Sequence, residues 1–151
     1  MDKVQLEAFI KTLKPDAEVK EGKQFIEVTV PSADLYPLAK ILREREETLF
    51  DFLVNLTGVD YINDMGVIYH LSSTKYRHMI VLKTRTSGRE NSVLDSVSNI
   101  WHTAEFHERE VYDLLGIRFN NHPDLRRLFL DSSWGFPLRK DYVDDINIVT
   151  K

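Results

Sequence analysis

The spacing of apolar residues predicts helices in three parts of the chain. Apolar side chains recur at intervals of three and four within residues 4–13, 35–42 and 96–115. Asp2 and Ser32 stand just ahead of the first two segments, where an N-cap residue is expected. We therefore predict these three segments to be helical.

Proline and glycine mark where these helices end. Pro15 cannot continue the first helix, because proline lacks an amide hydrogen and clashes with the preceding turn. Gly116 directly follows the third helix, where a glycine in the left-handed conformation commonly closes a helix. The run TLFDFLVNLTG at residues 48–58 fits neither period well, and we interpret it as a short helix that ends at Gly58.

Other apolar runs predict strands. Residues 24–30 alternate apolar and polar side chains and are closed by a proline. Residues 67–73 and 78–85 are two further strand-like runs, and the polar stretch STKYR between them predicts a hairpin. Residues 86–92 are interpreted as a surface loop, and residues 117–119 as a short strand.

The order of these elements indicates the fold class. Helices and hairpin strands are mixed without a regular β-α-β alternation, which favours an α+β, two-layer domain with a small mixed or antiparallel sheet covered by helices. We assign residues 1–120 to this domain. Residues 121–151 are rich in charged residues, proline and glycine, so we expect an extended C-terminal tail held by contacts and lacking its own core.

The amino-acid composition excludes several classes of cofactor site and catalytic group. The chain has no cysteine, which excludes disulfides, thiolate zinc sites, cysteine-ligated iron–sulfur clusters and a cysteine nucleophile. Its six glycines are too scattered to form a dinucleotide- or phosphate-binding loop. The net charge of −4 argues against a general nucleic-acid-binding protein. No leader peptide or bilayer-spanning run is present, so a cytosolic protein is expected.

A metal-dependent hydrolase is one alternative interpretation, based on the stretch HTAEFHERE. His102 and His107, with nearby acids, are the candidate ligands. Two ligands on one helix face need a spacing of four, whereas these histidines are five apart, and position 111 is a valine, so no H-E-x-x-H motif is formed. We therefore expect no metal site.

The predicted helix at residues 104–115 carries an unusual charge pattern. On a helical wheel, Glu105, Arg109 and Asp113 form one row at intervals of four, which we interpret as a solvent-exposed row of ion pairs. Glu108 projects from the apolar side. A buried carboxylate needs a partner, and the candidates nearest in sequence are Arg118, Arg126 and Arg127.

Two interpretations of this charged helix remain open. One is an internal network of glutamates and arginines that pins the tail against the helix. The other is an interface between protein subunits that uses paired charges and an aromatic anchor, because Phe106 lies on the charged side of the helix.

Three sequence blocks occur in a characteristic order. They are EREVYD at residues 108–113, followed by GI at 116–117; HPDLRR at 122–127; and PLRKD at 137–141. In this order and spacing they resemble the thirty-kilodalton subunit of the proton-pumping NADH–quinone oxidoreductase of respiratory complex I, also known as the C subunit. The resemblance covers most of the chain from about residue 50.

The chain departs from the family pattern in three places. Leu115 stands where the family usually has an aromatic residue, Phe106 and His107 where a Trp-Tyr pair is common, and SSWGF at 132–136 where a second GHP is more usual. Because of these departures, the chain could belong to either of two branches of the family. Related scaffold subunits occur in membrane-bound hydrogenases and formate hydrogenlyase-like complexes.

The resemblance implies a cofactor-free scaffold with no catalytic, cofactor-binding or metal-ligating residues and no activity alone. It would support the large quinone-site subunit and an adjacent iron–sulfur subunit in the hydrophilic arm, peripheral on the cytoplasmic side of the membrane, as electrons pass from NADH to quinone. Its tail would extend over the partner. The residues expected to hold the tail and the partner in register are Phe106, Glu108, Arg109, Glu110, Asp113, His122, Pro123, Arg126, Arg127, Arg139 and Lys140.

Overall fold

The structure is a computed structural model that describes residues 1–130 and 132–142. Its helices are α1 (Lys3–Leu13), α2 (Ser32–Glu44), α3 (Ala104–Leu115) and the short 3₁₀ helix η1 (Ser132–Trp134). Its strands are β1 (Glu18–Glu21), β2 (Ile26–Thr29), β3 (Phe52–Asp60), β4 (Met65–Ser72), β5 (Met79–Arg85), β6 (Val93–Asp95) and β7 (Arg118–Asn120).

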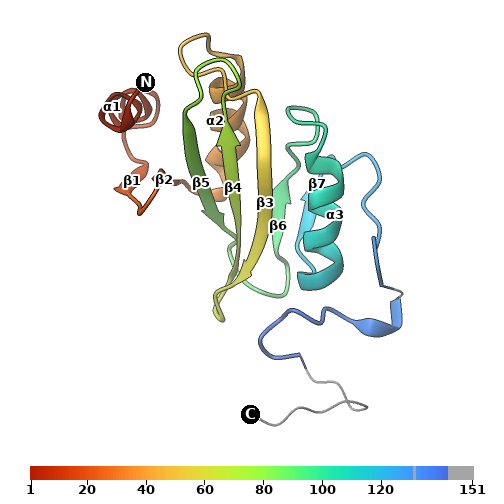
Figure 1. Cartoon of the computed structure of the whole chain (residues 1–151). Helices are drawn as coiled ribbons and strands as arrows, with labels where there is room; N and C mark the ends of the chain where they lie inside the picture. The colour runs from red at the N-terminus through yellow and green to blue at the C-terminus, as the bar shows by residue number, and fades with distance from the viewer. Residues whose placement is uncertain (131, 143–151) are drawn as a thin grey trace.

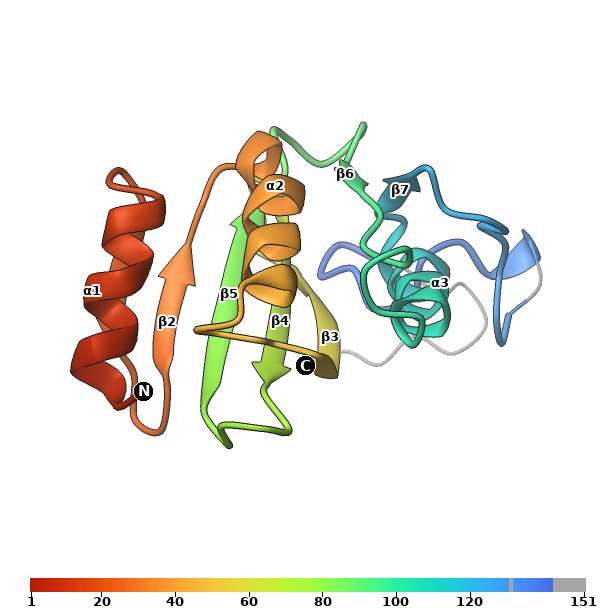
Figure 2. The same ribbon diagram turned by 90° about the horizontal axis from the view of Figure 1, so that it is seen from above.

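The fold is the predicted α+β arrangement. A five-stranded sheet has the order β1-β2-β5-β4-β3, and β6 and β7 form a separate parallel pair. The large sheet is mixed, because β2 and β5 are parallel while its other neighbours are antiparallel. Helix α2 covers one face, and α1 and α3 lie at the two ends of the sheet (Figures 1 and 2).

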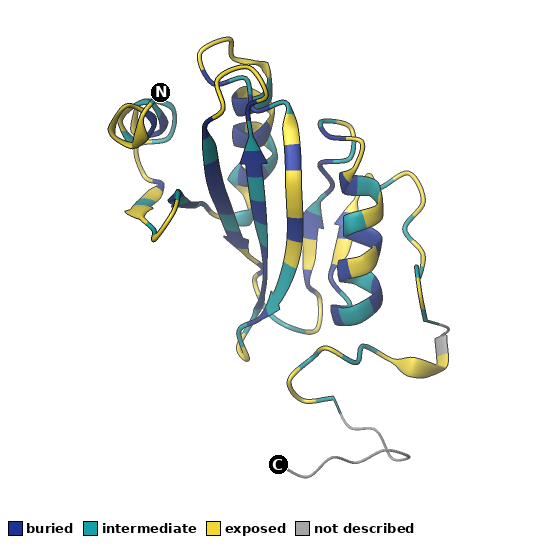
Figure 3. Ribbon diagram, in the orientation of Figure 1, coloured by how far each residue is buried: buried dark blue, intermediate teal, exposed yellow. Residues whose placement is uncertain are grey.

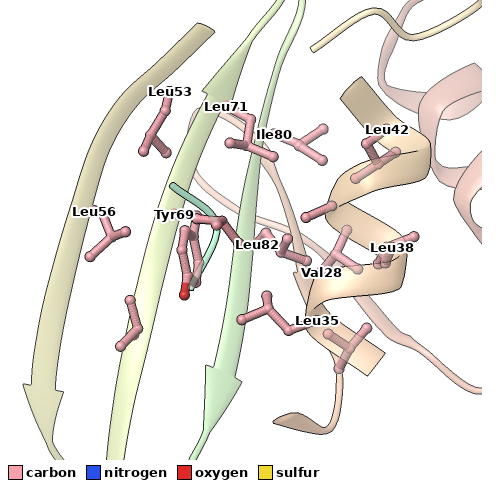
Figure 4. Close-up of a cluster of buried hydrophobic side chains, with 14 of the residues drawn as sticks. Val28, Leu35, Leu38, Leu42, Leu53, Leu56, Tyr69, Leu71, Ile80 and Leu82 are labelled. Atoms are coloured by element: carbon pink, nitrogen blue, oxygen red, sulfur yellow. The ribbon is translucent and has the colours of Figure 1, made fainter. Parts of the chain in front are cut away.

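The core lies between α2 and the sheet. Leu35, Leu38 and Leu42 follow one another along one side of α2 and point toward the strands (Figure 4). The sheet side chains that meet them are Val28, Leu53, Leu56, Tyr69, Leu71, Ile80 and Leu82. The amphipathic spacing seen in the sequence is thus what seats α2 on the sheet. In the described part of the chain, no helix has the length and apolar character needed to cross a bilayer.

The predicted ends of the first two helices are partly confirmed. Asp2 caps α1 through a reciprocal capping box with Gln5. Ser32 was predicted to be the N-cap of α2, but it is the first residue of the helix. The cap position is held by Pro31, which makes no side-chain hydrogen bond.

The predicted helix at residues 48–58 is wrong, because most of this segment belongs to β3. A β-bulge between Leu53 and Asn55 shifts the register of β3 against β4. Leu53 and Leu56 are therefore both buried although they are three residues apart, which imitates helical spacing. Gly58 lies inside the strand, where a Cβ atom would come within 2.5 Å of the Leu115 side chain and 2.8 Å of Val111. Its missing side chain allows α3 to pack directly on β3.

The third helix begins later than predicted. It starts at Ala104, and residues 96–103 form turns that lead into it. Gly116 closes it in the left-handed conformation, with φ of 80°, as predicted. The strand predicted at residues 117–119 is β7, whereas β1 and β6 were not predicted.

Candidate functional site

Helix α3 buries charge on two of its sides. Glu108 and Asp113 are fully buried and Arg109 is 7% exposed. The predicted exposed row containing Arg109 and Asp113 is therefore wrong. The segment after β7, residues 121–130 and 132–142, runs along that side of α3 and then turns under the C-terminal end of the helix (Figure 1). A helical wheel records only the residues of the helix, so it could not show that this segment covers the row.

Asp113 fastens the segment after β7 to the helix. Arg127 Nε donates to Asp113 Oδ1 at 2.5 Å, while the backbone amides of Phe129 and Leu130 donate to Oδ2 at 2.8 and 3.1 Å. Burial opposes ionisation of Asp113, but these hydrogen bonds outweigh it, so its pKa lies below the ordinary value. The ionised carboxylate thus clamps both a cation and the backbone.

Arg109 makes the neighbouring attachment. Its Nε and an Nη donate to the carbonyl oxygens of Arg126 and Arg127 at 3.2 and 3.0 Å. Its guanidinium also lies 6.0 Å from the centre of the Phe106 ring. Arg109 therefore holds the segment by its backbone, a contact that does not depend on the side chains at positions 126 and 127.

Glu108 has partners other than those predicted. It accepts from Ser96 Oγ at 2.6 Å and from the Val97 amide at 3.1 Å. Among the described residues it has no ion pair with an arginine, so the predicted arginine partner is wrong. The nearest ionisable nitrogen is His122 Nε2, at 4.0 Å. Burial raises the pKa of Glu108 to about 7, although the bonds from Ser96 and Val97 favour the charged form.

His122 lies between Glu108 and the start of the segment after β7. Its side chain is fully buried, and Nε2 lies 2.9 Å from the Glu105 carbonyl oxygen. The Asp124 amide donates to Nδ1 at 3.0 Å, which requires a free lone pair on that nitrogen. These two contacts together fit a neutral ring with its proton on Nε2. His122 thus joins the body of α3 to the turn at Pro123.

A second group of contacts holds residues 136–142. Arg139 Nε donates to the Leu115 carbonyl at 2.7 Å, and the Leu138 amide donates to the Leu114 carbonyl at 3.0 Å. Both acceptors belong to the last turn of α3, whose carbonyls have no partner within the helix. The Arg139 guanidinium also lies 4.8 Å from the Phe136 ring centre.

Asp60, at the end of β3, completes this second attachment. It is paired with Arg89 and accepts the Lys140 amide at 2.8 Å. The Arg89 guanidinium beside it holds the pKa of Asp60 well below its ordinary range. Arg89 also pairs with Asp141 at 3.0 Å. Asp60 and Arg89 were not predicted from the sequence, since no local spacing connects positions 60, 89 and 140.

The other residues singled out from the sequence lie on the surface. Phe106 is 55% exposed, and Glu110 and Pro123 are exposed. Among the residues that the structure describes, Arg126 pairs with the exposed Asp124 alone. The exposed Lys140 contributes its backbone amide to Asp60. His102 and His107 belong to no group of three or more potential metal ligands in the described residues.

Replacing Arg126 with alanine is expected to lower the free energy of unfolding by no more than about 0.5 kcal/mol, because both partners of its ion pair are exposed. Replacing the adjacent Arg127 is expected to cost several times more, because its partner Asp113 is fully buried. Urea denaturation of the two variants makes this comparison. Equal losses for the two substitutions would contradict the assignment of Arg127 as the attachment.

Residues 28–145 match the sequence model of the family described as the respiratory-chain NADH dehydrogenase 30 kDa subunit. The chain belongs to this family. The matched region contains β3, α3 and the described segment after β7, so the attachments at Asp113, Arg109 and Asp60 lie within a domain of the 30 kDa subunit family.

Two curated relatives illustrate the range of this family. The chain is 50% identical over 122 residues to the NADH-quinone oxidoreductase C/D subunit of Phocaeicola vulgatus, covering 80% of this chain and 23% of that protein. It is 40% identical over 127 residues to the NADH-quinone oxidoreductase C subunit of Chlorobium phaeobacteroides, covering 81% and 75%. The chain thus spans about a quarter of the length of the C/D relatives that it matches.

A solved structure shares the fold of this 30 kDa family chain. It is the structure of the membrane-bound sulfane sulfur reductase, an archaeal respiratory membrane complex. The TM-score is 0.81 at 23% identity, and the match covers 95% of this chain and 86% of the other. At this identity the likeness concerns the fold alone.

Proposed function

We propose that this chain is a non-catalytic structural and assembly subunit in the hydrophilic arm of a proton-pumping NADH:quinone oxidoreductase. The observation that carries the proposal is the way residues 121–130 and 132–142 are held. Two buried side chains of α3, Arg109 and Asp113, bind this segment mainly through its backbone. Such attachment fixes the course of the segment while leaving its side chains free to face a partner.

The side chains left free have the character of an interface. Phe129 is 70% exposed, Leu138 61% and Trp134 45%. They lie on the attached segment, which follows the side of α3 that carries the exposed Phe106. Exposed aromatic and aliphatic side chains along one segment, with arginines among them, are typical of protein–protein interfaces.

The partner we infer is the large quinone-site subunit, together with the adjacent iron–sulfur subunit. Relatives named as C/D subunits contain a match to this chain within a longer polypeptide, which supports a close association between the two parts. In this proposal residues 1–120 form the domain and residues 121–151 the tail on the partner, with residues 143–151 lying outside the described part. The complex would place the chain peripherally on the cytoplasmic side of the membrane.

A scaffold in a membrane-bound hydrogenase or formate hydrogenlyase-like complex is the second candidate. The same fold occurs in a chain of an archaeal respiratory membrane complex named as a sulfane sulfur reductase, so the fold by itself does not restrict the chain to the first candidate. The relatives at 40–50% identity carry the NADH-quinone oxidoreductase name, which favours the first candidate. Pull-down from native membranes with mass identification separates them, because NADH-oxidising subunits belong to one complex and a nickel-binding large subunit to the other.

A Phe129→Ser variant tests the scaffold proposal. Because Phe129 is 70% exposed, we expect the isolated variant to unfold within about 0.5 kcal/mol of the wild type. The yield of assembled complex should fall severalfold, while each assembled complex turns over at the normal rate. A matched control is Val4→Ser, since Val4 is 75% exposed on α1, at the opposite end of the sheet. Normal yield with slow turnover would contradict a purely structural role.

A further inference from the structure

Strand β3 forms one edge of the large sheet, and apart from its bulge between Leu53 and Asn55 and its contact with α3 at Gly58 it carries none of the usual protections of an edge. Residues 52–59 contain no charged side chain. The opposite edge strand, β1, consists of Glu18, Val19, Lys20 and Glu21. Proteins commonly protect edges with charges, prolines or a covering element, because an unpaired strand is a template for another chain. The two edges of this sheet therefore differ in their capacity to accept a strand.

The first part of β3 is open on its outer side. Helix α3 packs against β3 at Gly58. Among the described residues, the backbone of residues 52–57 bonds only to β4. Phe52 and Val54 are 48% and 42% exposed, and the exposed positions along β3 are interspersed with buried ones (Figure 3). This stretch thus presents free backbone groups next to exposed apolar side chains.

A small apolar hollow lies beside this edge. It has a volume of about 70 Å³ and is lined by Leu56 and Thr57 of β3, Val111 and Leu114 of α3, and Leu138. A strand laid along β3 would pass this hollow and could place one apolar side chain in it. Strand addition generally works in this way, since backbone bonds supply affinity and side-chain pockets supply specificity.

The charge beside the hollow indicates what kind of strand fits. Glu110 also lines it, is exposed, and has no ion pair within the described residues. Phe106, Glu110 and Leu114 are spaced at intervals of four, so they form one row on α3 that extends the surface beside the hollow. A basic residue flanking the apolar anchor would meet Glu110.

We propose that the free edge of β3 accepts an extended segment of a partner protein in the complex as an additional strand, with an apolar side chain in the hollow and a basic residue beside Glu110. The proposal deepens the scaffold function above and rests on it. A second copy of this chain fits less well. Its own β3 offers no basic residue over residues 52–59, so Glu110 would remain without a countercharge.

Hydrogen–deuterium exchange of the isolated chain and of the purified native complex tests this proposal at the backbone. We expect the outward-facing amides of residues 52–57, those that do not donate to β4, to exchange at least tenfold more slowly in the complex. Unchanged exchange in a complex that protects residues 126–130 would overturn strand addition while leaving the scaffold proposal intact. Protection that rises with the concentration of the isolated chain would also overturn it, because the occupant would then be a second copy.

Two lysine substitutions, one near each edge of the sheet, form a matched pair of variants. Val54→Lys places a charge on the exposed edge of β3, and Gln24→Lys places the same charge at an exposed position near the opposite edge. We expect Val54→Lys to reduce recovery of the complex at least fivefold and Gln24→Lys to leave it unchanged, with both isolated chains folding normally by urea denaturation. Equal recovery for the two variants would refute the proposal.

Discussion

Replacement of Asp113 by alanine is expected to lower the free energy of unfolding by about 3 kcal/mol and to release residues 128–130 from α3, while Arg109 still holds the carbonyls of Arg126 and Arg127. The substitution removes the carboxylate that binds Arg127 and the amides of Phe129 and Leu130. It leaves the Arg127 guanidinium, 18% exposed on its side chain, without its countercharge. The loss of global stability cannot exceed the free energy with which the segment is attached, because beyond that point the segment detaches.

Urea denaturation and limited proteolysis measure the two consequences separately. Trypsin should cleave after Arg127 faster in Asp113→Ala than in the wild type, because the Arg127 side chain is freed from Asp113 and only Arg109 still holds the adjoining backbone. Asp124→Ala is the matched control, since in the described part of the chain the Asp124 side chain pairs with Arg126 alone, on the surface. We expect that control to change stability by no more than about 0.5 kcal/mol. If trypsin cuts both variants at the wild-type rate, Asp113 does not hold the segment.

The second large effect is a dependence of stability on pH that Glu108→Gln should remove. The pKa of Glu108 is raised from an ordinary value of 4.5 to about 7 because its carboxyl is buried. The folded chain therefore binds more protons than the unfolded chain between these values, and the contribution of Glu108 to stability falls as pH rises from about 4.5 toward 7. Glutamine keeps the shape and the bond to the Val97 amide but carries no charge. The Glu108→Gln variant should have the same free energy of unfolding as the wild type near pH 4. At pH 8 its free energy of unfolding should be about 3 kcal/mol higher than that of the wild type.

The measurement is the free energy of unfolding of both proteins from pH 4 to pH 8. Taking the difference between them cancels the titration of all other groups. Glu110→Gln is the control, because Glu110 is exposed, and it should follow the wild-type profile. Parallel profiles for Glu108→Gln and the wild type would show that Glu108 ionises without cost, and the raised pKa would then be wrong.

Much of the architecture follows from local patterns. The helix α1 with its Asp2 cap, the hairpin of β4 and β5, and the end of α3 at Gly116 were all predicted. Each depends on residues near one another in the sequence, so periodicity and capping chemistry are sufficient to locate it. The main failure, β3, arose because a bulge imitates helical spacing, and only the register with β4 resolves it.

The residues of the candidate site were likewise predicted only in part from the sequence. The three sequence blocks identified the family, and Arg109, Asp113 and Arg127 were among the residues singled out. Their surroundings differed from those predicted: Arg109 and Asp113 are buried beneath a distant segment, and Glu108 binds Ser96 in place of an arginine. Asp60 and Arg89 were missed, since they meet residues 140 and 141 only in space.

The sequence by itself determined the family, the α+β class, the lack of cysteine chemistry and the region where charges concentrate. Only the tertiary structure decided which of those charges are buried, which partners they bind, and that the uncharged residues 52–59 lie at the edge of the sheet. The physical reason is that periodicity reports which side of an element is apolar. The segment that covers the other side comes from elsewhere in the chain, and its position sets burial, pKa and hydrogen bonding.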